Sequence, residues 1–198
     1  AGRSCTDDEV RIVRVYDDKR AEPDDLVPMD GKTPGEIIIF PCFKSTLTYP
    51  GNEELTKDKF YKGWIYTHDL GTWDKNQFIT VSGRKDDMII SSGENIYPAQ
   101  VEEAINCHPS VADCIVTAVP DKARGEAVVA YVIPKDDSLT IKDLNKYCAN
   151  HPDLSAYKCP RFYCFVDKIP YNATGKKLHY VVKAQAPEDL EKGILQKP

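Results

Sequence analysis

The chain has 198 residues, of which 41% are hydrophobic and 29% are charged, and its formal net charge is −5 at pH 7. This composition is typical of one or two folded domains, and an acidic chain without a basic stripe is not expected to bind nucleic acid. No apolar run approaches the roughly 20 residues of a membrane span, and the opening AGRSCTDDE has no signal-peptide core, so neither feature is expected.

Short apolar runs separated by turn-forming residues predict a β-rich unit in the first part of the chain. The segments between these runs are rich in Pro, Gly and Asp, which favour turns. The expected strands are EVRIVRVY (9–16), EIIIF (36–40), GWIYTHDLG (63–71) and QFITVSG (77–83). We therefore expect residues 1–83 to form a β-rich subdomain.

The pattern changes after residue 83 and predicts a small α+β domain. Pro98 suits the first turn of a helix, whose apolar stripe would contain Val101, Ala104 and Ile105. CIVTAVP (114–120) and AVVAYVIP (127–134) predict two buried strands joined by a polar turn, and RFYCFV (161–166) predicts a third. Thr140 is expected to cap a further helix. Its inward face would carry Leu144, Tyr147 and Cys148.

Seven cysteines occur singly, and no two of them form a CxxC pair. An odd number of scattered cysteines among apolar neighbours favours reduced thiols in a cytosolic protein. Zinc ligation is the alternative, but the ligand spacing for it is missing, so no metal site is predicted. The cysteines are Cys5, Cys42, Cys107, Cys114, Cys148, Cys159 and Cys164.

Two loops combine glycine with charged residues. GRKDDMIISSGENIYPAQVEEAI (83–105) places four charges after a glycine and just before a small, open stretch and a helix start. IPYNATGKKLHY (169–180) ends a polar loop in Lys176 and Lys177, and Gly175 before them permits a tight turn. Each loop also has an ordinary interpretation when it is taken alone. The first can be a charged linker, and the second can be a solvated loop with two surface lysines.

The order of four sequence blocks resembles the carboxyl-terminal part of the adenylate-forming superfamily, which includes acyl-CoA synthetases, nonribosomal adenylation domains and luciferases. The blocks are GEIII (35–39), LTKDKFYKGWIYTHDLG (55–71), the 83–105 segment and PYNATGKK (170–177). The GENIYP sequence motif is most similar to that of acyl- or aryl-CoA ligases. In this family ATP activates an acid as an acyl-adenylate, and a thiol then takes the acyl group with release of AMP.

The resemblance implies two nucleotide-binding residues. Asp69, in THD where the family has TGD, would accept hydrogen bonds from both ribose hydroxyls. Without the resemblance, Asp69 is a turn former at a strand end. His68 stands where the family usually has Gly, and its ring would crowd or contact the nucleotide. Arg84 would reach the ribose or phosphate region, its alternative role being an ion pair with Asp86 or Asp87.

The resemblance also implies a catalytic lysine and a hinge. Lys176 would bridge the carboxylate and the α-phosphate during adenylation, where negative charge accumulates. Asp86, within a hinge at 84–87, would be the pivot about which the 84–198 domain swings between the two half-reactions. The segment 91–95 would then lie beside the CoA pantetheine tunnel, with Ser92, Gly93, Glu94 and Asn95 as its lining. The family frequently has Arg at position 179 and in some relatives a second lysine at position 90; this chain has His179 and Ile90, and no role is assigned to Ile90.

The glycine-rich phosphate loop of the family is not found in these residues, nor is an acyl pocket. We therefore expect a fragment or one subunit of a split enzyme, in which 1–83 is the last β-rich subdomain of a larger amino-terminal domain and 84–198 is a mobile lid. ATP and Mg²⁺ would be bound mostly by that upstream domain, with CoA and a carboxylic acid, such as a fatty or aryl acid, as the other substrates. The chain alone is expected to be inactive. Two alternatives stay open: loading of a carrier-protein phosphopantetheine, and a non-catalytic module that kept the fold.

Overall fold

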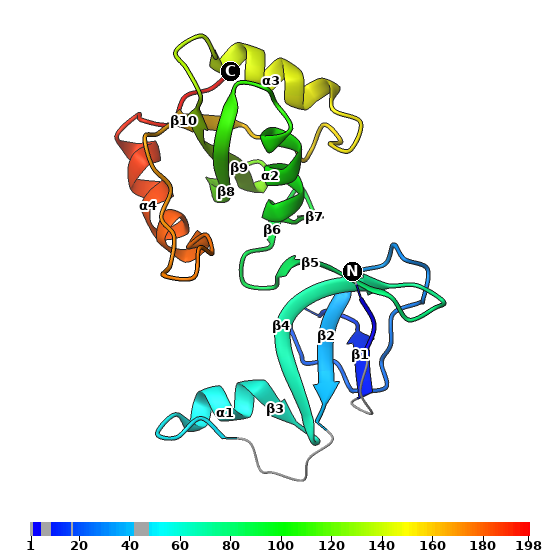
Figure 1. Ribbon diagram of the computed structural model, residues 1–198. Coiled ribbons are helices and arrows are strands. Elements are labelled where there is room, and N and C mark those ends of the chain that lie inside the picture. Colours follow the sequence, from blue (N-terminus) through cyan, green and yellow to red (C-terminus); the bar gives the residue numbers. More distant parts are fainter. Residues whose placement is uncertain (1, 5–8, 17, 42–47) are drawn as a thin grey trace. The chain divides into compact units, whose positions relative to one another are not determined.

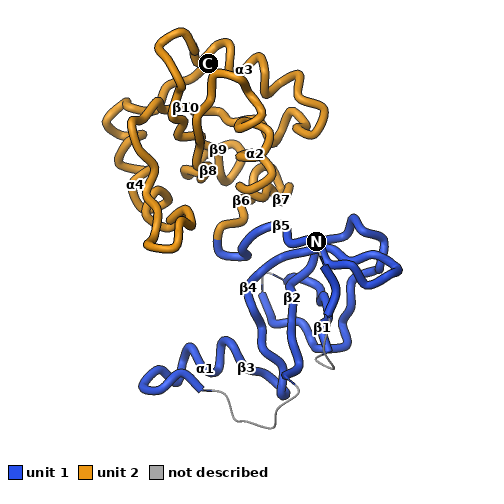
Figure 2. The backbone as a smooth tube through the Cα atoms, viewed as in Figure 1, with its two compact units in different colours: residues 1–86 blue, residues 87–198 orange. Residues whose placement is uncertain are grey.

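The computed structural model describes residues 2–4, 9–16, 18–41 and 48–198 (Figure 1). The chain divides into two compact units, residues 1–86 and 87–198 (Figure 2). Each unit has its own sheet and its own apolar clusters. The boundary expected after residue 83 falls inside a strand, because β5 extends to Arg84.

Unit 1 contains an antiparallel sheet of five strands over its described residues, in the order β1-β2-β4-β3, with β5 paired to the second half of β4. Its elements are β1 (Glu9–Val13), β2 (Gly35–Phe40), α1 (Glu53–Lys59), β3 (Phe60–Tyr61), β4 (Trp64–Trp73) and β5 (Ile79–Arg84). Neighbouring apolar residues of one strand enter two different clusters: Ile12 and Ile37 belong to one, Val13 and Ile38 to the other. This is the two-residue alternation of a strand, and it explains why EIIIF is apolar throughout.

Unit 2 contains a second five-stranded sheet, in the order β10-β9-β6-β7, with β8 also paired to β9. β10 runs parallel to β9, and the other pairs are antiparallel. Its elements are β6 (Ile89–Ser91), β7 (Glu94–Ile96), α2 (Pro98–Asn106), β8 (Val111–Asp121), β9 (Gly125–Pro134), α3 (Ile141–Asn150), β10 (Phe162–Phe165) and α4 (His179–Glu191).

Helices cover both faces of this second sheet. α2 and α3 pack against one apolar cluster, which includes Val128 and Ala130 of β9, whereas α4 packs against the other, which includes Val129 and Tyr131 (Figure 1). A strand that is buried on both faces has no polar positions to alternate with. The continuous apolar runs in β8 and β9 follow from this arrangement.

The predicted α+β class is confirmed, as are the buried strands and the two helices in unit 2. Thr140 caps α3, since its Oγ1 accepts a hydrogen bond from Asp143 N at 3.2 Å. Tyr147, which was expected on the inward face of α3, is only half-buried, and its ring contacts the rings of His108 and His151. The first strand is shorter than expected and ends at Val13. Within the described residues, no helix is both long and apolar enough to cross a bilayer.

Two helices were not expected from the sequence. α1 has no buried residue and begins at the cap Asn52, whose Oδ1 accepts from Leu55 N. α4 buries Val182, Ala186 and Asp189, which have the spacing of one helix face, but Pro187 and the polar residues between them obscure that pattern.

Candidate functional site

The Thr67–Asp69 motif lies at a β-bulge in the middle of β4. Glu36 and Ile38 of β2 pair with Leu70 and Tyr66, so that residues 67–69 lie opposite Ile37 alone. His68 adopts a φ of 61°, in the left-handed region. Thr67 Oγ1 fixes the bulge, since it donates to Ile37 O at 2.8 Å and accepts from Asp69 N at 3.0 Å. A bulge redirects side chains, and this one presents the Asp69 carboxylate at the surface.

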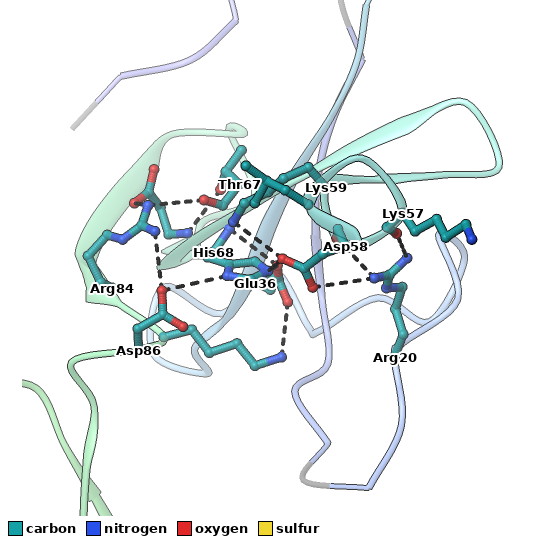
Figure 3. A network of polar contacts seen from close by, with 12 residues as sticks. Arg20, Glu36, Lys57, Asp58, Lys59, Thr67, His68, Arg84 and Asp86 are labelled. Atoms are coloured by element: carbon teal, nitrogen blue, oxygen red, sulfur yellow. Dashed lines mark hydrogen bonds and ion pairs between the residues drawn. The ribbon is translucent and has the colours of Figure 1, made fainter. Parts of the chain in front are cut away.

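Arg84 lies directly across the β4–β5 ladder from Asp69. Its Nη1 donates to Asp69 Oδ1 at 3.0 Å and to Thr67 O at 3.1 Å, and its Nη2 donates to Asp86 Oδ2 at 3.3 Å (Figure 3). The alternative ion pair of Arg84 with Asp86 therefore exists beside the contact with Asp69. The Arg84 and Asp69 side chains are 44% and 42% exposed, which leaves both accessible to a ligand.

The ring of His68 lies among carboxylates (Figure 3). Its Nε2 is 3.2 Å from Asp58 Oδ2, and its Nδ1 is 3.6 Å from Asp86 Oδ2. Glu36 beneath it is only 4% exposed and is paired with Lys85 Nζ at 3.3 Å. A left-handed φ is most easily adopted by glycine, and histidine is one of the side chains that tolerate it. The ring thus links the bulge both to α1 and to Asp86.

The segment predicted to line a pantetheine tunnel forms the β6–β7 hairpin. Ser92 and Gly93 are its two turn residues, with φ values of 55° and 80°, and residues 92–95 are all exposed. A two-residue hairpin with both φ values positive is the type that favours glycine at its second position. A Cβ on Gly93 would meet no atom within 4 Å, so within this chain the turn, and not a close neighbour, requires the glycine. Glu126 of β9 holds the base of the hairpin, because its Oε2 accepts a hydrogen bond from Ile90 N at 2.7 Å.

Lys176 lies at the end of a tight loop organised by Asn172. The Asn172 Oδ1 atom accepts from Thr174 N at 3.0 Å and from Lys176 N at 2.9 Å. Gly175 completes the turn with a φ of 78°. Lys176 is exposed, and within the part of the chain that the structure describes its ammonium forms no ion pair. This loop therefore presents an available cation on an ordered backbone.

Lys177 has the opposite environment. Its side chain is 18% exposed, and its Nζ is 3.3 Å from Oε2 of Glu102, a buried residue of α2. His179 Nε2 is 2.7 Å from the other oxygen of Glu102, and this hydrogen bond raises the pKa of His179 despite partial burial. Sequence reasoning missed Glu102. The available signal was a carboxylate next to Val101 and three residues before Ile105, beside the apolar stripe of α2.

The structure thus gathers the predicted residues into two groups, one in each unit. Asp69, Arg84 and Asp86 form a connected network in unit 1. Lys176 and the β6–β7 hairpin belong to unit 2. No cluster of three or more metal-binding side chains occurs among the described residues.

The cysteines of the described residues are unpaired. Cys107 is exposed, and the other four are buried: Cys114, Cys148, Cys159 and Cys164. Burial raises the pKa of the Cys148 thiol to about 11, which disfavours the reactive thiolate. Cys5 and Cys42 lie outside the described residues, and the cytosolic location inferred from cysteine usage stays a prediction.

Comparison with known proteins identifies the family of the chain. Residues 100–176 match the AMP-binding enzyme C-terminal domain. The chain is 40% identical over 132 residues to the 2-succinylbenzoate–CoA ligase of Bacillus licheniformis, covering 67% of this chain and 27% of that enzyme. It is 37% identical over 159 residues to the corresponding ligase of Bacillus cereus, covering 80% and 32%. The chain therefore spans about a third of the length of these curated relatives.

Solved structures give the same result. The o-succinylbenzoate CoA synthetase of Bacillus subtilis, in complex with its acyl-adenylate intermediate, superimposes with a TM-score of 0.73 and 34% identity, over 89% of this chain and 34% of that one. A fatty acyl CoA synthetase of Mycobacterium tuberculosis matches with a TM-score of 0.60 and 33% identity, over 93% and 34%. The chain accordingly belongs to the adenylate-forming superfamily and corresponds to the carboxyl-terminal part of its CoA ligases.

Proposed function

We propose that these residues are the carboxyl-terminal part of an ATP-dependent acid–thiol ligase that makes a CoA thioester through an acyl-adenylate. The observation that carries the proposal is the ordered, exposed Lys176 loop in a chain that also keeps the Asp69–Arg84 pair. Retention of Asp69, Arg84 and Lys176 together argues against a non-catalytic module that kept only the fold. The relatives named above are CoA ligases, which supports CoA as the acceptor thiol.

In the first proposed step, a carboxylate oxygen of the acid attacks the α-phosphorus of ATP, and the bond to pyrophosphate breaks. Lys176 stabilises the negative charge that gathers on the carboxylate and phosphate oxygens. Asp69 accepts hydrogen bonds from the ribose hydroxyls, and Arg84 both orients Asp69 and offers a guanidinium to the nucleotide. Mg²⁺ would neutralise the leaving pyrophosphate, and an upstream domain would hold it with most of the ATP.

In the second step, the CoA sulfur attacks the acyl carbon, the bond to AMP breaks, and the thiol proton passes to solvent. We propose that residues 84–87 are the hinge between the steps, with Asp86 as the pivot, and that the 84–198 domain then presents Ser92, Gly93, Glu94 and Asn95 to pantetheine. Residues 1–83 would stay with the upstream domain as its last β-rich subdomain. An exposed hairpin tip suits contact with an extended pantetheine arm, because a Cβ on Gly93 would meet no atom within 4 Å and the turn leaves room for a ligand there.

The identity of the carboxylic acid substrate is a separate part of the proposal. The named relatives act on 2-succinylbenzoate in two organisms, and a solved relative is a fatty acyl CoA synthetase, so aryl and fatty acids both belong in the test. The protein that carries this chain with its upstream domain should catalyse ATP–pyrophosphate exchange that depends on one of these acids and release AMP when CoA is added. Exchange without thioester formation on CoA, but with thioester on a phosphopantetheinyl carrier protein, would favour carrier loading. No exchange with any acid would overturn the proposal.

A further inference from the structure

The Lys176 loop is a short hairpin whose two arms meet at an isolated bridge between Tyr171 and Lys177. Asn172 N donates to Lys176 O at 2.9 Å, and Lys176 N donates back to Asn172 Oδ1 at the same distance. These bonds fix the shape of the tip. They do not attach the hairpin to the sheet, so its orientation depends on contacts at its base.

Asp113 of β8 contacts both arms of that base. Lys177 Nζ is 2.8 Å from Asp113 Oδ1, and the Tyr171 hydroxyl donates to the other carboxylate oxygen, Oδ2. Cys114 N donates to Asp113 Oδ1 at 2.8 Å, which orients the carboxylate. Burial raises the pKa of Asp113, but the bonds from Lys177 and Tyr171 outweigh it and hold that pKa below its usual value.

Glu102 of α2 provides the second attachment. Its Oε2 pairs with Lys177 Nζ at 3.3 Å, while its Oε1 accepts from Val116 N at 2.9 Å. Lys177 also donates to the backbone carbonyl of Cys114. A half-buried ammonium with three partners has one strongly preferred position, because moving it would leave buried charges unpaired. The residue directly after Lys176 is therefore held on the sheet.

We propose that Asp113 and Lys177 are positioning residues for Lys176: together they clamp both arms of the hairpin so that the Lys176 ammonium points away from the sheet in one orientation. This inference rests on the proposed role of Lys176 in adenylation. Without these contacts the hairpin would keep the structure of its tip, but the Lys176 side chain would no longer be held in one direction. Misplacement of a reacting group by about 1 Å can cost on the order of 100-fold in rate.

The first test measures the hairpin itself, with ¹⁵N relaxation on the 198-residue chain. Asp113→Ala removes the contact to both arms, and Lys177→Met removes it from one arm while keeping the length of the side chain. Each should lower the backbone order parameter at Lys176 from about 0.85 to below about 0.6 while β8 and β9 stay rigid. Lys177→Arg should preserve order. Lys192→Met, which removes an exposed pair with Glu188, is the matched control and should change nothing at the hairpin.

The second test measures the two half-reactions in the protein that also carries the upstream domain. Lys177→Met should lower the kcat of pyrophosphate exchange about tenfold or more, leave KM for ATP within twofold, and leave thioester formation from supplied acyl-adenylate within twofold. Lys177→Arg should restore exchange. A merely structural role would lower both half-reactions together.

The outcomes separate this inference from the proposed function. An unchanged order parameter in both Asp113→Ala and Lys177→Met would overturn the clamp, whatever the activity. If Lys176→Ala leaves pyrophosphate exchange intact, the proposed function fails, and the order parameters still decide whether the clamp exists. If a variant does not fold, the other variant and the Lys177→Arg exchange rate decide the question.

Discussion

Arg84 and Asp69 are partners across the β4–β5 ladder, and the guanidinium Nη1 of Arg84 lies 3.0 Å from Asp69 Oδ1. This contact uses only one carboxylate oxygen of Asp69, so the other, Oδ2, can accept a hydrogen bond from a hydroxyl group. Because the two backbones are paired at this position, the geometry of the side chains is fixed by the sheet rather than by a loop. If Asp69 binds ribose as proposed, its carboxylate would be oriented before the nucleotide binds.

Asp69→Asn should therefore weaken nucleotide binding in the protein that carries the upstream domain. Loss of a hydrogen bond to a charged acceptor costs about 1.5–3 kcal/mol, which is on the order of 10- to 100-fold in the Kd for AMP. Calorimetric titration of AMP measures it. Asp137→Asn, at an exposed position in a different unit, is the control. An unchanged Kd in Asp69→Asn would remove Asp69 from the nucleotide site.

Position 68 should prefer glycine to alanine. A residue with a Cβ in the left-handed region costs about 1 kcal/mol relative to glycine, and His68 has a φ of 61°. Both His68→Gly and His68→Ala remove the ring contacts to Asp58 and Asp86, so their difference isolates the backbone. Urea unfolding should find His68→Ala about 1 kcal/mol less stable than His68→Gly. Equal stabilities would mean that the bulge relaxes in solution.

Asp86→Pro should separate the two half-reactions. Proline fixes φ near −65° and removes a backbone donor, so a hinge at this residue would be trapped in one orientation. One half-reaction should then persist while the other falls steeply. Asp86→Ala is the matched control, since it removes the carboxylate that contacts Arg84 without fixing φ. If both rates of Asp86→Pro stay within about twofold, which is under half a kcal/mol, Asp86 is not the pivot.

The His179–Glu102 contact should make stability depend on pH. The hydrogen bond to Glu102 raises the pKa of His179 in the folded state, whereas burial opposes it. The folded state thus binds this proton more tightly than the unfolded state. The stabilisation is fully present below the ordinary histidine pKa of about 6.5 and is lost as pH rises through the raised value.

Urea unfolding of the 198-residue chain between about pH 6 and 9 measures this loss. His179→Gln keeps a hydrogen-bond donor without a titrating charge and should flatten that part of the profile. Other charged groups also face the ring or its pocket and are unchanged in that variant: Asp87, Glu126, Lys177 and Lys183. An equal fall in His179→Gln would show that His179 is not the group responsible for the pH dependence.

The local pattern of apolar residues predicted the helices and strands that bury a continuous apolar face or run. Val101, Ala104 and Ile105 identified α2, and unbroken apolar runs identified β8 and β9, because each of these signals lies within one segment. α4 was missed because Pro187 interrupts it and only a narrow face, Val182 and Ala186, packs on the sheet.

The details of the candidate site depend on residues far apart in the sequence. The bulge at Thr67–Asp69 exists only against β2, and the environment of His68 comes from α1 and from Asp86. The clamp on Lys177 comes from Asp113 and Glu102, which precede it by more than 60 residues in chain order. No local periodicity encodes such contacts, so the resemblance could predict Lys176 as a site residue but not the side chains that hold its loop.

The most direct measurement compares Lys176→Ala in the two half-reactions, in the protein that includes the upstream domain. Removal of a group that stabilises charge in the transition state typically costs about 100- to 1000-fold. The account predicts this loss in acid-dependent pyrophosphate exchange, with thioester formation from synthetic acyl-adenylate within about twofold of the parent, since the proposed hinge motion would withdraw Lys176 in that step. Equal losses in both half-reactions, or no loss in exchange, would contradict it.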